Sequence, residues 1–165
     1  MNKYVNLARE YKMLDAVLIS PDDIYFDIRT ILKCRWGCGD FFKDSIKCHV
    51  RNTTFAERVE MIKSYKYILM VHSNDAQELS HAMLKLERTA FLDGYYFALA
   101  IRSCHLCPSC AVDKGEPCPS PEKIRPCEIS FGIDVFKTAR KQGFPCEVLQ
   151  NKDETPNRYG FLLIE

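Results

Sequence analysis

The stretch Ser103–Cys127, SCHLCPSCAVDKGEPCPSPEKIRPC, carries five of the nine cysteines of this 165-residue chain. The five cysteines are Cys104, Cys107, Cys110, Cys118 and Cys127. The first three form a C-x2-C-x2-C triplet, which places three thiols in one short loop, and a proline follows the fourth. Bacterial ferredoxin loops combine the same triplet with a Cys-Pro pair, but with a shorter gap before it than the seven residues here. The stretch therefore predicts a metal site, and its triplet favours an iron–sulfur cluster.

Zinc is the alternative metal. Structural zinc sites also take four thiolates, but usually as two C-x2-C pairs from separate loops, and three cysteines in one such run suit them less well. A [4Fe–4S] cluster is held by four thiolates, and cysteines two residues apart suit it. The four residues that could hold one cluster by themselves are Cys104, Cys107, Cys110 and Cys118.

A second group of cysteines lies upstream, in CRWGCGDFFKDSIKC. Cys34, Cys38 and Cys48 have C-x3-C-x9-C spacing, and glycines on both sides of Cys38 allow the tight backbone that a bound metal needs. The alternative is that these are buried free thiols. With Cys127 as a fourth ligand the group would hold a second cluster, whereas three thiolates alone would leave one iron open to bind a substrate. The sequence leaves both arrangements open.

Residues beside the cysteines are candidates for tuning a cluster, because nearby cations raise its reduction potential. Arg35 and Arg102 adjoin the two cysteine groups and are the cations that we expect to matter. His81 falls on the polar side of a predicted long helix, where we expect it to be solvated. Cys146, at the start of a predicted strand, is the expected bystander.

The composition is that of a globular protein, with 47% hydrophobic and 27% charged residues. The 23 basic residues nearly balance the 22 acidic ones, so we expect no nucleic-acid partner and no binding to membrane surfaces. No apolar run is long enough for a transmembrane helix, and we expect no signal peptide, because charged residues interrupt the N-terminus. We therefore expect a cytoplasmic protein, in which clustered thiols are ligands rather than disulfides.

The hydrophobic pattern predicts one α/β (α+β) domain over residues 1–165, with helices packed on a mixed sheet. Helices are expected over residues 4–14, from the capping box Thr54-x-x-Glu57, from Asn74 to Gly94, after Ser120-Pro121, and over 134–142. Strands are expected over residues 24–32, 67–71, 95–101, 146–149 and 161–164. The strands at 24–32 and 95–101 each run into a cysteine group, so parallel pairing would place both cysteine loops at one edge of the sheet.

Three segments together resemble a known family. They are LKCRWGCGDFFKDSIKC, CHLCPSCAVDKGEPCPSPEKIRPC and FGIDVFKTARKQG. They are similar to an uncharacterised family of predicted metal-binding proteins found mainly in anaerobic bacteria and archaea. The resemblance implies metal binding, with iron–sulfur as the expected group, and assigns no reaction. The chain departs from the family pattern after Cys48, where His49 and Val50 replace two prolines, and at Cys127, where relatives often carry serine.

The expected function is that of a small iron–sulfur protein, with one or two [4Fe–4S] clusters, that passes electrons to or from a partner redox enzyme. One alternative is an enzyme in which an open iron beside Cys34, Cys38 and Cys48 binds substrate. The other is a zinc-stabilised binding module without a redox role. The sequence has no dinucleotide-binding, P-loop or nucleophile-elbow motif, and it leaves the oligomeric state open, with a homodimer as the common default.

Overall fold

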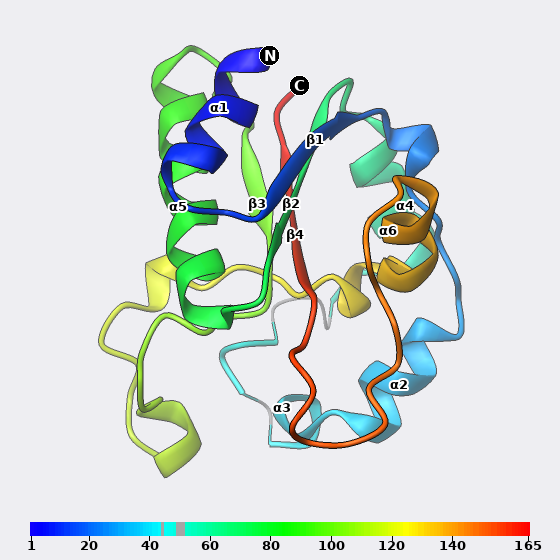
Figure 1. The fold of residues 1–165 in the computed structure, drawn as a ribbon. Coiled ribbons are helices and arrows are strands. Elements are labelled where there is room, and N and C mark those ends of the chain that lie inside the picture. The colour runs from blue at the N-terminus through cyan, green and yellow to red at the C-terminus, as the bar shows by residue number, and fades with distance from the viewer. Residues whose placement is uncertain (44, 49–51) are drawn as a thin grey trace.

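A four-stranded sheet forms the centre of the molecule in the computed structural model, which describes residues 1–43, 45–48 and 52–165 (Figure 1). The strands are β1 (Asp15–Ile19), β2 (Ile68–Ser73), β3 (Leu99–Ile101) and β4 (Arg158–Leu163). Their order across the sheet is β1-β2-β4-β3, and each of the three pairings is antiparallel. His49 and Val50, at which the chain departs from the family pattern, lie outside the described residues.

The predicted fold class, a single α+β domain, is confirmed, but the sheet is antiparallel at each described pairing rather than mixed. β2 and β3 run in the same direction and are joined by helix α5 (Ala76–Leu92), as in a β-α-β unit. They do not pair, because the C-terminal strand β4 lies between them and runs the opposite way.

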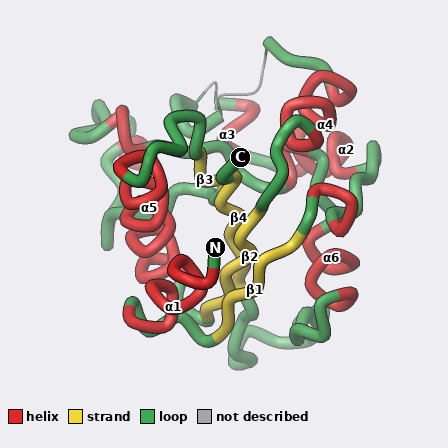
Figure 2. Tube along the Cα trace, turned by 90° about the horizontal axis from the view of Figure 1, so that it is seen from above, coloured by secondary structure: helices red, strands yellow, loops and turns green. Residues whose placement is uncertain are grey.

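Helices cover both faces of this sheet (Figure 2). On one face, α1 (Asn2–Glu10) and α5 pack on Leu69 and Val71 of β2. On the other face, Ile62 of α4 (Phe55–Lys63) and Ala139 of α6 (Val135–Lys141) join the core around Ile68 and Met70. Because β2 is buried on both sides, its first four residues, 68–71, form a continuous apolar run rather than an alternating one.

Local signals in the sequence place the two helices that frame the site. The Thr54–Glu57 capping box begins α4, with Glu57 N–H donating to Thr54 Oγ1 and Thr54 N–H donating to the Glu57 carboxylate. Asp75, one residue after the predicted cap, begins α5, since its carboxylate accepts the Glu78 N–H at 2.7 Å. Gly94 follows the end of α5 with a φ of +102°.

The predicted strand at 24–32 is wrong. The chain forms an isolated bridge between Phe26 and Ile133 and then enters α2 (Thr30–Gly37), followed by α3 (Gly39–Phe42). Ile28 and Leu32 are more than half exposed, so their alternation does not mark a strand face that is buried against a core. Asp27 starts the helical turn instead, because its side chain accepts the Arg29 N–H and its carbonyl accepts the Thr30 N–H.

Other predicted strands are shortened or missing in the described chain. Residues 146–149 form no strand, because Val148 and Leu149 are exposed and pair with no neighbouring strand. The strand predicted over 95–101 is limited to β3, since Tyr96 and Phe97 are about 70% exposed. β1 was not predicted, and it forms because the Asp15–Ile19 segment pairs along β2 after a shorter α1 than expected.

The loop after β3 carries the second cysteine group to the lower end of the sheet (Figure 1). It contains three short 3-10 turns, at Val112–Lys114, Pro121–Lys123 and Ile129–Phe131. The last of these turns packs against α2, which carries the first cysteine group. The two groups therefore meet through packing of a helix on a loop, and not through parallel strands.

None of the described helices combines the length and the hydrophobicity that a membrane-spanning segment needs.

Candidate metal centre

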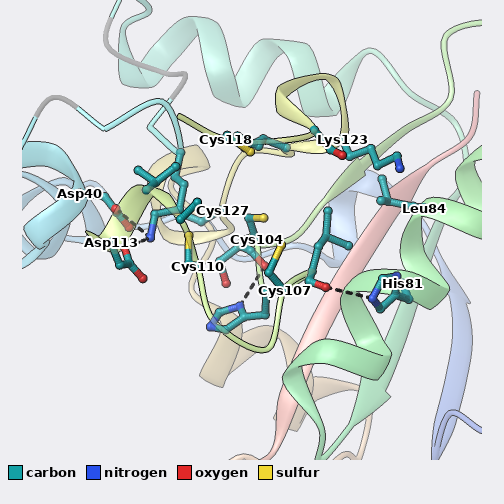
Figure 3. Close-up of a pocket in the computed structure, with 18 of the residues that line it drawn as sticks. Asp40, His81, Leu84, Cys104, Cys107, Cys110, Asp113, Cys118, Lys123 and Cys127 are labelled. Atoms are coloured by element: carbon teal, nitrogen blue, oxygen red, sulfur yellow. Dashed lines mark hydrogen bonds and ion pairs between the residues drawn. The ribbon is translucent and has the colours of Figure 1, made fainter. Parts of the chain in front are cut away.

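A cavity of about 890 Å³ lies between the two cysteine groups and α5 (Figure 3). Eight of the nine cysteines line it: Cys34, Cys38, Cys48, Cys104, Cys107, Cys110, Cys118 and Cys127. Ligand-binding pockets of proteins span about 300–1,000 Å³, so the cavity has the size of a ligand site. Cys146 is buried in the core with Ile133 and Tyr159 and does not line the cavity.

The first set of thiols surrounds Cys34, on the buried side of α2. Burial raises the pKa of the Cys34 thiol, and negative charge on Cys48 and Cys38 raises it further. Burial also raises the pKa of the Cys127 thiol to about 11, against the opposing effect of hydrogen bonds from Ser130, and Cys34 adds to the shift. Cys127 thus adjoins the first set, although it is 79 residues from Cys48 in the sequence.

The second set of thiols surrounds Cys104, directly after β3. Burial raises the pKa of the Cys104 thiol, a hydrogen bond from the Leu106 backbone opposes the shift, and three neighbouring thiols add to it. Those neighbours are Cys110, Cys107 and Cys118. Cys107 is exposed, whereas the other three are partly buried, so this set lies at the open side of the cavity.

Among the described residues, no three Cys, His, Asp or Glu side chains converge in the arrangement of ligands around one metal ion. Burial and mutual repulsion both favour the neutral thiols, so four thiolates converge only when a positive centre offsets their charge. Most of the donors that line the cavity are nevertheless sulfur, and thiolate sulfur selects iron–sulfur clusters or zinc over hard cations such as Mg²⁺. The residues therefore fit a thiolate-bound metal.

Lys47 joins the two cysteine segments across the cavity wall. Its ammonium lies 2.6 Å from Asp113 Oδ1 in the second segment and 3.1 Å from Asp40 Oδ1 in the first. The Lys47 side chain is only 15% exposed, and its charge lowers the pKa of Asp113. These contacts engage both carboxylates that line the cavity, which leaves the thiols as the most numerous metal donors of its wall.

Helix α5 holds the backbone of the second cysteine loop. Gln77 Nε2 donates to the Leu106 carbonyl at 3.2 Å, and His81 Nε2 lies 3.1 Å from the same oxygen. His81 also lines the cavity (Figure 3). His81 is exposed, as expected, but it also contacts the loop, because the loop folds back onto the side of α5 that the helical pattern marks as polar.

Arg58 is the residue at this site that sequence reasoning missed. It is 3% exposed, and its guanidinium donates to the backbone carbonyls of Thr53, Thr54 and Ser130. No carboxylate in the described chain forms an ion pair with it. Burial lowers the pKa of its guanidinium, and negative charge on Cys34 and Cys48 opposes that shift. The sequence does contain a signal for it, because Arg58 falls on the apolar face of the helix that the Thr54–Glu57 capping box predicts.

The two arginines expected beside the cysteines lie in different surroundings. Arg35 is exposed on α2, and its charge slightly lowers the pKa of Cys34. Arg102 is 7% exposed and lies 3.2 Å from Glu128 Oε1 and 2.9 Å from Ser103 Oγ. The Nε and Nη2 atoms of Arg102 donate no hydrogen bond to the described chain. The positive charge of Arg102 is already balanced by the Glu128 carboxylate.

Comparison with known proteins gives one family. The model of the family described as "Predicted metal-binding protein (DUF2284)" matches residues 17–164, nearly the whole chain. No curated protein and no solved structure matches the chain. The matched range includes both cysteine groups and Arg58. The chain therefore belongs to this family of predicted metal-binding proteins.

Proposed function

We propose that the protein binds one or two [4Fe–4S] clusters and passes electrons to or from a partner redox enzyme in the cytoplasm of an anaerobic organism. The observation that carries the proposal is that eight cysteines from two distant segments line one cavity. A bound cluster supplies one-electron transfer, at a potential that its surroundings tune. The proposed ligands of the surer cluster are Cys104, Cys107, Cys110 and Cys118. Those of the second are Cys34, Cys38, Cys48 and Cys127.

The cations of the chain support this proposal. Clusters held by four thiolates carry net negative charge, and buried charge requires a partner. Arg58 is buried beside Cys34 and Cys48, and it has hydrogen bonds only to neutral carbonyls in the described chain. A guanidinium in this position would balance the charge of a second cluster and hold α2 against the Ser130 turn.

The exposed side of α2 and α3 is the surface that we propose for the redox partner. Cys34 is on the buried side of α2, while Leu32 and Trp36, four residues apart, are 58% and 69% exposed. Phe42 of α3 is also exposed, and exposed cations stand beside these apolar groups at Lys33, Arg35 and Lys43. None of the three cations pairs with a carboxylate of the described chain. An apolar patch with a basic rim suits a partner with an acidic surface, because opposite charges steer the encounter.

A second candidate function is an enzyme in which an open iron binds substrate. The observation that favours it is the extent of the cavity, which continues past the cysteines along α5 to Thr89 and Tyr11. An electron carrier needs no such space. Binding of a substrate to one open iron of a cluster would appear as a ligand-induced change in the paramagnetic spectrum of the reduced protein.

The deciding experiment is the content of iron, acid-labile sulfide and zinc per chain in protein purified without oxygen. About eight irons with eight sulfides would support two four-iron clusters, and about four of each would support one. A visible absorption spectrum of the same sample checks that iron and sulfide form clusters. Zinc without sulfide would contradict the redox proposal and leave a zinc-stabilised binding module.

A further inference from the structure

The cavity has a part that contains no cysteine. It extends along α5 past Leu84 to Lys85, Arg88 and Thr89, and on the facing loop it includes Lys123. We call these four polar residues of the wall, together with Ser120 and Tyr11, the α5 arm of the cavity. Figure 3 shows Lys123 reaching from the loop toward Leu84 of α5, above the loop that carries Cys104 and Cys107.

The α5 arm is positively charged. The two carboxylates that line the cavity, Asp40 and Asp113, are both engaged by Lys47 at its other end. In the described chain, Lys85, Arg88 and Lys123 form no ion pair with a carboxylate; the Lys85 ammonium instead lies 5.2 Å from the centre of the Tyr11 ring.

The nearest acidic side chain on α5 does not compensate these charges. Glu87 is paired with Arg125 through a 2.5 Å contact, and it also accepts the Ala100 N–H at 2.7 Å. Its side chain is 13% exposed, so its charge is satisfied inside the fold rather than in the cavity. Lys85, Arg88 and Lys123 are exposed and line a concave space in which no described carboxylate balances their charge.

We propose that the α5 arm binds a small oxyanion substrate, a carboxylate or a phosphate ester, beside the cysteine-bound metal. Cations from α5 and from the loop line one cavity, and Tyr11 and Ser120, whose hydroxyl groups can donate hydrogen bonds, line the same wall. Oxyanions are bound by such combinations of charge and hydrogen-bond donors. The position beside the cluster rests on the proposed function, whereas the binding itself does not.

Calorimetric titration with inorganic pyrophosphate and with citrate tests the proposal and distinguishes the two oxyanion classes. The protein is purified without oxygen and measured at fixed ionic strength. The K85Q/R88Q variant should bind the preferred anion at least about tenfold more weakly, with unchanged metal content, because two cations of the site are lost. K123Q is a second variant, on a separate segment, should the α5 double variant fold poorly.

The chain offers a matched control. Lys137 and Arg140 on α6 have the same residue types and the same spacing, and they lie on the opposite face of the sheet, away from the cavity. K137Q/R140Q removes the same charge and should leave anion binding unchanged. Equal weakening in both double variants would reveal a general charge effect and overturn the proposal.

Further outcomes separate this inference from the proposed function. If the protein contains no iron but still binds an anion through Lys85 and Arg88, the result would support the anion site and contradict the iron–sulfur cluster. Failure of both anions to bind the iron-loaded protein, combined with iron loss in K85Q/R88Q, would show that these cations only balance the cluster and would overturn the inference. Binding that also changes the paramagnetic spectrum would place the anion beside the cluster.

Discussion

At the scale of single residues, surroundings divide nine chemically equal cysteines into different roles. Cys146 is buried among apolar side chains, whereas eight others line the cavity. Within the cavity, Cys127 is sufficiently buried for its pKa to rise to about 11, and Cys107 is exposed. A thiol with a raised pKa is a poor nucleophile and becomes a thiolate only beside a positive centre such as a metal.

Replacing one cysteine of the triplet tests the ligand assignment. Cys110→Ala should reduce iron and sulfide by about half if two clusters are present, because a four-iron cluster needs its four thiolates. Cys146→Ala is the matched control and should retain full iron content. Iron and sulfide analysis of both variants measures the effect, and equal iron loss in the two would contradict the assignment.

Arg58 is the residue on which the packing beside Cys34 depends. Arg58→Met keeps much of the length of the side chain but removes the hydrogen bonds from the guanidinium to the carbonyls of Thr53, Thr54 and Ser130. We expect the free energy of unfolding to fall by about 3 kcal/mol, at roughly 1 kcal/mol for each lost hydrogen bond. Denaturant unfolding measures it. The exposed Arg35→Met on α2 serves as control and should change stability by less than about 0.5 kcal/mol.

At the scale of elements, short turns rather than long helices shape the cavity. The 3-10 turn Ile129–Phe131 packs on α2, brings Cys127 to the first cysteine set and ends at Gly132. Gly132 has a φ of +83°, and a Cβ atom on it would contact the Phe55 ring, with Cδ2 at 2.9 Å. The turn therefore requires glycine both for its backbone conformation and for the space beside α4.

A pair of glycine substitutions separates these two causes. Gly143 has a similar φ of +78°, but nothing would lie within 4 Å of its Cβ atom. Gly143→Ala should lower the free energy of unfolding by about 1–2 kcal/mol, from backbone strain alone. Gly132→Ala should cost more, since Phe55 must also move, and it should reduce metal retention at the first set. Equal decreases in the thermal unfolding temperature of the two variants would show that the contact with Phe55 has no effect.

At the scale of the whole molecule, the site is an interface between distant parts of the chain. The sheet and α5 position the second cysteine loop, while α2 and α3 bring the first, and Lys47 bridges the two through Asp40 and Asp113. A cluster at such an interface would itself hold the segments together, because metal binding that requires the folded arrangement stabilises that arrangement.

Loss of the Lys47 bridge should loosen this interface. Lys47→Met should speed iron release to a chelator roughly fivefold, equivalent to about 1 kcal/mol for a partly buried ion pair. Absorbance decay under chelator measures the rate. Lys141→Met removes a 2.9 Å surface pair with Asp23, away from the cavity, and should leave the rate unchanged. Similar acceleration in both variants would contradict a bridging role for Lys47.

The proposed partner surface predicts salt-dependent electron transfer. K33Q/R35Q should lower the rate constant for electron exchange with an acidic ferredoxin several-fold at low salt, because the basic rim steers the encounter. The difference should disappear near 1 M salt, where charges are screened beyond about 3 Å. Stopped-flow absorbance measures the rates. A variant as fast as the unmodified protein at low salt would reject this surface.

The sequence by itself determined the local features and the chemistry of the site. Caps and periodicity place α4 and α5, because these signals act within a few residues. Cysteine spacing identifies the donor atoms, since three thiols within seven residues share one loop wherever the loop goes. The family match extends the same conclusion, metal binding, over residues 17–164.

Only the tertiary structure decided which distant residues meet. The alternation at 24–32 predicts a strand, but the described pairing of this segment is limited to the bridge between Phe26 and Ile133. After it, Asp27 and the packing of α2 on the 129–131 turn make the segment helical. Cys127 joins Cys34, Lys47 reaches Asp113, and Arg58 is buried between Cys34 and the Ser130 carbonyl through contacts between parts far apart in the chain. Such contacts depend on the relative placement of whole elements, which no local pattern encodes.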